Sequence, residues 1–76
     1  MANEIVLMHT QDCHLCEQAQ AMLDHLGAGY RSQDIAASAE WVETYGIRIP
    51  VLVMGERELG WPFDIESLDA FLQGAS

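Results

Sequence analysis

The residues best suited to chemistry in this 76-residue chain are its two cysteines, Cys13 and Cys16. They stand two residues apart in the stretch HTQDCHLCEQAQAML, between a short apolar run and a helix-like pattern. A pair at this spacing can be a structural disulfide, part of a metal site or a redox dithiol. The function of the chain depends on which of these three holds.

A structural disulfide is the least favoured of the three. A disulfide stabilises a protein mainly by closing a loop of the unfolded chain, and the effect grows with loop length. The loop from Cys13 to Cys16 is very short, so closing it adds little stability. The start of the chain, MANEIVLMHTQD, has no basic segment and too short an apolar run for a signal peptide. We therefore expect a cytoplasmic protein, and the cytoplasm keeps thiols reduced.

A metal site would need further ligands beside the two cysteines. Structural zinc takes four ligands, commonly from a second Cys or His pair, and the chain has no second Cys pair. His9 could supply a third ligand, whereas His14 stands between the thiols and would point away from a site that they shared. We expect no bound metal, and metal handling by the Cys-x-x-Cys pair remains an alternative.

A redox dithiol has positive physical support. Cys13 follows the apolar run and Cys16 falls in the first turn of the expected helix, where free N–H groups and the helix dipole stabilise a thiolate. Such a pair can form a mixed disulfide at one cysteine and resolve it with the other. We predict Cys13 as the nucleophile and Cys16 as the more buried, resolving thiol. His14, if protonated, would stabilise the thiolate and Asp12 would raise the thiol pKa, although both side chains could simply be solvated.

The elements that must position this pair follow from hydrophobic periodicity. The continuous apolar runs EIVLM (residues 4–8) and VLVM (residues 51–54) predict buried, central strands. A one-sided apolar pattern predicts an amphipathic helix between them; its apolar residues are Leu15, Ala19, Met22, Leu23 and Leu26. The weakly alternating YRSQDI (residues 30–35) predicts a second strand.

Capping and turn residues define the rest of the chain. Ser38 can begin a short helix that Gly46 ends, with its apolar face formed by Ala39, Val42 and Tyr45. Gly55 and Glu56 fit a two-residue hairpin turn into a return strand over residues 57–61. Asp64 can cap a last helix, whose apolar stripe comprises Ile65, Leu68, Phe71 and Leu72.

The resulting order, β-α-β-α-β-β-α, predicts an α/β fold for a single domain over residues 1–76. The first half forms a right-handed parallel β-α-β unit and the second a hairpin and a helix. We expect a four-stranded mixed sheet with helices on both faces. The two continuous apolar runs should be its central strands.

The charge balance disfavours some classes of binding partner. Twelve acidic residues stand against three arginines and no lysine, a net charge of −9. This charge repels nucleic-acid phosphates and anionic membranes, and no apolar run approaches the roughly 20 residues that cross a bilayer. We expect a monomer with neither partner. A binding module that recognises a basic protein, with little redox activity, remains an alternative function.

CHLC after a buried strand, the element order and RIPVLVMG resemble the glutaredoxin-like branch of the thioredoxin fold. The resemblance covers Ile5 to Leu72 and is nearest to a small bacterial group of unassigned substrate. It implies a thiol-disulfide oxidoreductase that transfers electrons to a protein disulfide or to glutathione. It also implies that Pro50 is cis, and that Ile49 and Pro50 offer backbone groups to an extended substrate.

The departures from this family fall on glutathione recognition. The lysine usual shortly before the first cysteine is replaced by Thr10. The usual Gly-Gly-x-Asp becomes LGWPFD, in which Trp61 replaces the second glycine and Asp64 matches the acid. We therefore expect no tightly bound cofactor, and glutathione as a weakly bound reductant that Asp64 and its helix start could contact. Trp61 and Phe63 are more simply explained as core residues, as is Met8.

Overall fold

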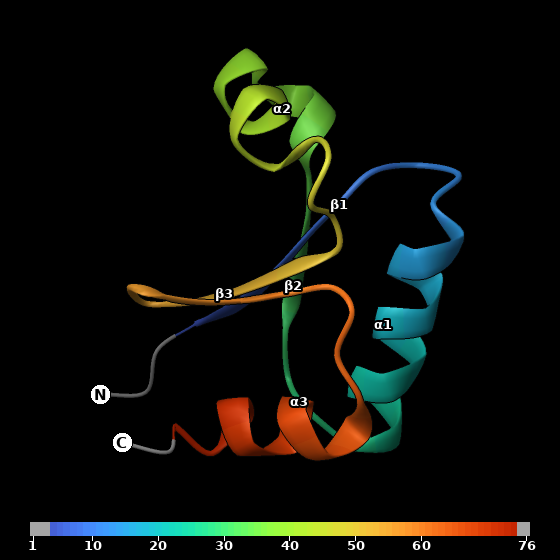
Figure 1. Cartoon of the computed structure of the whole chain (residues 1–76), viewed down its shortest axis with the longest axis vertical. Helices are drawn as coiled ribbons and strands as arrows, with labels where there is room; N and C mark the ends of the chain where they lie inside the picture. Colours follow the sequence, from blue (N-terminus) through green and yellow to red (C-terminus); the bar gives the residue numbers. More distant parts are fainter. Residues whose placement is uncertain (1–3, 75–76) are drawn as a thin grey trace.

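The computed structural model describes residues 4–74, which form a four-stranded sheet with three α-helices (Figure 1). The strand order is β2-β1-β3-β4, with bounds β1 Ile5–His9, β2 Arg31–Asp34, β3 Val51–Met54 and β4 Arg57–Gly60. Strand β1 is parallel to β2 and antiparallel to β3, and β3 and β4 form a hairpin. The predicted α/β, thioredoxin-like fold is confirmed, with the two apolar runs as its central strands.

The alternation of side chains along the central strands divides the core between two faces. Leu7 of β1 lies opposite Leu52 of β3, and Met8 lies opposite Val51. Because successive residues of a strand point to opposite faces, the first pair belongs to one core cluster and the second pair to the other. All four residues are buried, and the prediction of Met8 as a core residue is confirmed.

Helices α1 (His14–His25) and α3 (Ile65–Leu72) contribute to the larger core. They lie on the same side of the sheet in Figure 1. The buried members of this core are Leu7, Ala19, Leu23, Leu52, Met54, Phe63, Leu68 and Phe71. Trp61 packs against it with its ring edge on Phe63, at a centroid distance of 5.0 Å, which confirms the predicted packing role of the two aromatic residues.

The other face carries a 3-10 turn, Ile35–Ala37, and the short helix α2, Ala39–Tyr45. Ser38 caps α2 and Gly46 ends it, as predicted. The apolar face of α2 differs from the expectation: Trp41 and Tyr45 pack against the second core, whereas Val42 is 48% exposed.

Two other predicted apolar stripes are wrong at their first residue. Leu15 is 42% exposed at the start of α1, and Ile65 is 36% exposed at the start of α3. Both belong to the first turn of their helix. There the apolar spacing is already present, but the side chains are not yet covered by the core. The stripes hold further along, where Leu23 and Leu68 are buried completely.

Local hydrogen bonds set the ends of the outer strands. Strand β2 stops at Asp34 because this side chain accepts a hydrogen bond from the N–H of Ala36 (2.9 Å) and starts the 3-10 turn; the predicted strand ran through Ile35. The predicted hairpin turn lies at Gly55 and Glu56, and Gly55 has a φ of +64° that glycine adopts without steric cost. Among residues 4–74, no helix is long and apolar enough to span a membrane.

Candidate functional site

The dithiol lies where the chain leaves the central strand β1 and enters α1, as predicted. Cys13 is the N-cap residue of this helix, with extended backbone angles (φ −108°, ψ 104°), and its Sγ accepts a hydrogen bond from the Cys16 N–H at 3.1 Å. The two cysteines form a disulfide with a Cα–Cα distance of 5.2 Å. An N-cap sulfur in this position takes the place of the oxygen that usually satisfies a free N–H of the first turn.

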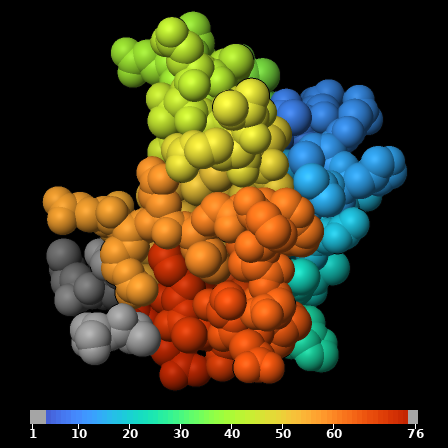
Figure 2. All heavy atoms as spheres, in the orientation of Figure 1, coloured from blue at the N-terminus to red at the C-terminus, as the bar shows by residue number. Residues whose placement is uncertain are grey.

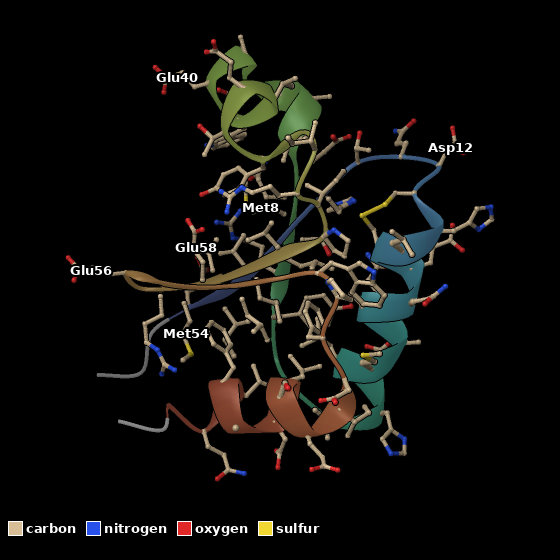
Figure 3. All side chains as sticks on the ribbon, viewed as in Figure 1. Met8, Asp12, Glu40, Met54, Glu56 and Glu58 are labelled. Carbon is tan, nitrogen blue, oxygen red and sulfur yellow. A yellow bond between two sulfur atoms is a disulfide. The ribbon has the colours of Figure 1, made fainter. Side chains whose placement is uncertain are left out.

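The two sulfurs differ in their access to solvent. Cys16 is only 2% exposed, whereas Cys13 is partly exposed in front of the helix. Figure 3 shows the disulfide at the start of α1, facing the end of the sheet. Cys13 is therefore more accessible than Cys16 to a disulfide partner from solution.

Exposed polar residues surround the accessible sulfur. Asp12 precedes it with a φ of +57°, a left-handed conformation that Asp and Asn tolerate better than most residues. Its side chain lies at the outer edge of the loop and points into solvent (Figure 3). His14 and Glu17, in the first turn of α1, are also exposed. Both expected tuning residues, His14 and Asp12, thus lie beside Cys13 in solvent.

Residues 49 and 50 lie at the same end of the sheet as the loop that follows β1. The antiparallel register pairs Met8 with Val51, so the start of β3 adjoins the end of β1. The Ile49–Pro50 peptide bond is cis, and Pro50 is fully buried. Its carbonyl accepts a hydrogen bond from the Trp61 N–H at 3.1 Å. Figure 2 shows the segments near residues 15, 50 and 60 meeting on one face.

Asp64 has a structural task that the sequence already predicted. It is the N-cap of α3, and its Oδ1 accepts a hydrogen bond from the Ser67 N–H at 2.8 Å. This backbone hydrogen bond lowers the pKa of the Asp64 carboxyl below its ordinary value, although the group is fully exposed. The carboxylate that was expected to contact glutathione is therefore held at the start of α3.

Sequence reasoning missed the link between Trp61 and Pro50. Residue 61 was expected at the end of the return strand, but β4 ends at Gly60, and the Trp61 N–H bonds the Pro50 carbonyl beyond it. The Trp61–Pro62 peptide bond is also cis. The signal in the sequence was Pro62, because proline has no N–H to donate to a strand ladder and so favours an end of the strand before it.

The chain is similar to one protein family and to several solved structures. The family model of the glutaredoxin-like domain (DUF836) matches residues 4–73. The chain belongs to this glutaredoxin-like family. A crystal structure of a structural-genomics target, XcR50 from X. campestris, is 42% identical with a TM-score of 0.86, over 95% of this chain and 99% of that one. No curated protein matches.

More distant solved structures share the fold. Protein Ne2328 from Nitrosomonas europaea is 25% identical with a TM-score of 0.78, over 95% of this chain and 93% of that one. The glutaredoxin of Archaeoglobus fulgidus is 19% identical with a TM-score of 0.70, over 95% and 88% of the two chains, a likeness of fold alone. The glutaredoxin-like fold and the bonded Cys13–Cys16 pair together support a thiol-disulfide redox role.

Within residues 4–74, no group of three or more His, Cys, Asp or Glu side chains is arranged to hold a metal ion. The two cysteines themselves are bonded to each other in the described structure.

Proposed function

We propose that this protein is a thiol-disulfide oxidoreductase in which Cys13 is the nucleophile and Cys16 resolves the intermediate. The observation that carries the proposal is the asymmetry of the pair: an accessible Sγ at the N-cap of α1, hydrogen-bonded to the Cys16 N–H, and a buried partner within bonding reach. The same N–H and the helix dipole would stabilise a Cys13 thiolate.

The reaction has two exchange steps. The Cys13 thiolate attacks one sulfur of a substrate disulfide; a mixed disulfide forms, and the other substrate sulfur leaves as a thiolate. The deprotonated Cys16 then attacks the Cys13 sulfur, which forms the internal disulfide and releases the second substrate thiolate. The substrate gains two electrons and two protons, and the protein dithiol loses them. An external thiol, such as glutathione, returns the dithiol by the reverse exchange.

The surrounding residues have supporting roles in this proposal. Ile49 and Pro50 would present backbone groups to the bound substrate from the neighbouring strand end. His14 and Asp12 would adjust the thiolate in opposite directions, since a positive charge favours it and a negative charge disfavours it. The substrate would be a protein disulfide or a glutathione disulfide, and Asp64 at the start of α3 could contact glutathione. A cytoplasmic monomer with no tightly bound cofactor fits this cycle.

Trapping of the mixed disulfide tests the proposal. In Cys16→Ser the second step is impossible, so a mixed disulfide with an added disulfide substrate should accumulate on Cys13 and be detected by mass spectrometry. Cys13→Ser serves as the matched control, because its remaining thiol is buried and should react far more slowly. Equal trapping by the two variants, or none by either, would contradict the assigned roles.

The reduction potential of the Cys13–Cys16 couple tests the direction of electron flow. A reversible carrier coupled to glutathione needs a potential near the cytosolic glutathione poise, about −220 to −320 mV depending on the method. Equilibration with glutathione redox buffers, followed by alkylation and mass spectrometry, measures it. If the couple stays fully oxidised or fully reduced in all of these buffers, the result would favour the alternative function, a binding module whose thiols have little redox activity.

A further inference from the structure

Two acidic residues stand close to Cys13 in the chain, one on each side of it. Asp12 directly precedes Cys13, and Glu17 lies one helical turn after it, with its N–H donating to the Cys13 carbonyl at 3.1 Å. Both side chains are exposed. A substrate of Cys13 must therefore approach the segment that carries these two negative charges, on a chain whose net charge is already −9.

No arginine in the described chain offsets these carboxylates. Arg31 is bound to Glu4 at 3.2 Å, and its strand register places it opposite Val6, near the start of β1 rather than its end. Arg57 stacks on the ring of Phe71 and begins β4, at the hairpin turn.

The third arginine is nearer to the site but is already paired. Arg48 precedes Ile49, and its guanidinium binds the Glu58 carboxylate at 3.2 Å and lies over the Tyr45 ring at 5.2 Å. Its charge is neutralised locally, and the chain contains no lysine. Of the three arginines, only Arg57 at the hairpin has no acidic partner among the described residues, and an anionic substrate at the dithiol would not meet it.

An apolar contact accompanies the negative charges. Leu15 stands between the two cysteines in the chain and is 42% exposed. Covering this apolar surface with an apolar side chain of a substrate would be favourable, since burial of apolar area stabilises association. Cys13 therefore has two exposed acidic residues and one exposed leucine close to it in the chain.

We propose that the dithiol selects disulfides in positively charged polypeptide segments that carry an apolar side chain, and that it disfavours anionic disulfides such as oxidised glutathione. The inference rests on the proposed function, since the dithiol is the site and Asp12 and Glu17 only choose among its substrates. The chemistry is the two-step exchange described above, with two electrons and two protons passing from the dithiol to the cationic disulfide.

Matched peptide disulfides test this selectivity. The probes are homodimers of one short peptide with a cysteine and a leucine, in which the residues flanking the cysteine are lysine, glutamine or glutamate. The rate constant for oxidation of the reduced protein is measured by acid quench and mass spectrometry. Each rate constant is divided by the rate constant for the reaction of the same peptide disulfide with a small neutral dithiol. This ratio removes differences in the intrinsic reactivity of the peptides.

We expect the lysine peptide to react about tenfold faster than the glutamate peptide at low ionic strength, with the glutamine peptide between them. The ratio should approach one in about 1 M salt, where the Debye length is only about 3 Å.

Two double variants of equal net charge locate the effect. Asp12→Asn with Glu17→Gln removes the flanking charges, and asparagine keeps the left-handed backbone at position 12 accessible. Glu40→Gln with Glu56→Gln removes two exposed carboxylates from α2 and from the hairpin turn, both distant from Asp12 in Figure 3. The first double variant should reduce the peptide ratio to within about twofold, and the second should leave it near the wild-type value.

The outcomes separate this inference from the proposed function. Failure of the glutamine peptide to oxidise the wild-type protein would reject the oxidoreductase itself. Normal oxidation by the glutamine peptide with a lysine-to-glutamate ratio of one would reject only the selectivity. Equal loss of the ratio in both double variants would show that overall charge, and not the pair beside Cys13, selects the substrate.

Discussion

The two faces of the sheet carry hydrophobic cores of different size. On the face covered by α1 and α3, eight buried residues form one cluster, whereas the face of α2 has a cluster of three. No residue of α2, which the structure describes in full, is buried. A cavity of about 250 Å³ remains open there beside Trp41 and Tyr45.

The two cores hold different parts of the chain in place. The larger core holds α1 and therefore the Cys13–Cys16 pair at its start. The smaller core holds the chain that leads from α2 through Arg48 to Pro50. We expect mutations on the first face to change the stability of the whole molecule, and mutations on the second face to change mainly the substrate side of the site.

The largest effect should come from Leu23→Ala on α1. Leu23 is completely buried in the larger core, and truncation of such a leucine costs about 2–5 kcal/mol of the free energy of unfolding. Val42→Ala on α2 is the control, since Val42 is half exposed and a substitution at such a surface position usually changes stability by less than about 0.5 kcal/mol. Urea unfolding of both variants, in the reduced and oxidised states, measures the difference.

Trp41→Ala should destabilise the protein less than Leu23→Ala, although it removes a larger side chain. The ring packs on the smaller core and is partly exposed beside the open cavity, so truncation breaks fewer contacts than at a closed position. We expect a loss of about 1–2 kcal/mol, below the range for a fully buried tryptophan. A loss equal to that of Leu23→Ala would mean that the two faces contribute equally to stability.

The same difference explains how much of the fold could be predicted. The central strands follow from their continuous apolar runs because they are buried on both faces of the sheet, and α1 follows from its one-sided pattern because that side packs on the larger core. The predicted face of α2 was right at Tyr45 and wrong at Val42, which was expected inside and is exposed while Trp41 packs instead. A helix that buries no residue has a weak pattern, and its orientation depends on contacts with distant strands.

The features of the candidate site that depend on neighbouring residues were predictable, whereas the features that depend on tertiary contacts were not. The place of Cys13 and Cys16 at the start of a helix follows from the neighbouring residues alone. The left-handed backbone of Asp12 and the hydrogen bond from Trp61 to the Pro50 carbonyl do not. The hydrogen bond joins the residue after β4 to the residue before β3, and no periodic pattern predicts such a contact.

A smaller, pH-dependent effect is expected from the cap of α3. The hydrogen bond from the Ser67 N–H lowers the pKa of the Asp64 carboxyl in the folded state. Its contribution to stability is therefore complete above the unfolded pKa of about 3.9 and is lost as the pH falls through the lower folded value. Asp64→Ser, which keeps a capping oxygen without the charge, should show a flatter decline in thermal stability below about pH 4.

The second cap provides the control for this measurement. Ser38 caps α2 through its hydroxyl, which accepts a hydrogen bond from the Trp41 N–H at 3.5 Å and does not titrate in this range. Ser38→Ala should lower stability by about 0.5–2 kcal/mol at every acidic pH. Parallel pH profiles for wild type and Asp64→Ser would show that the Asp64 carboxylate makes no titrating contribution.

The smallest change in stability should come from Glu58→Gln on the second face. Glu58 binds Arg48 at 3.2 Å, and the side chains are 40% and 44% exposed. Exposed ion pairs of this kind contribute about 0.2–1 kcal/mol. Glu56→Gln is the control on the same hairpin, since it removes an equal charge at the exposed turn. Urea unfolding should place both variants within about 1 kcal/mol of wild type.

The rate of substrate capture should respond more strongly than stability in this variant. Arg48 is held by Glu58, by the Tyr45 ring and by the Thr44 carbonyl, and it stands two residues before Pro50. Loss of the ion pair loosens the chain that presents the backbone at Pro50, so oxidation by a neutral peptide disulfide should slow severalfold. Glu56→Gln should leave the rate unchanged. A Glu58→Gln protein that loses more stability than Trp41→Ala, yet keeps the wild-type rate, would show that the second face supports the fold and not the site.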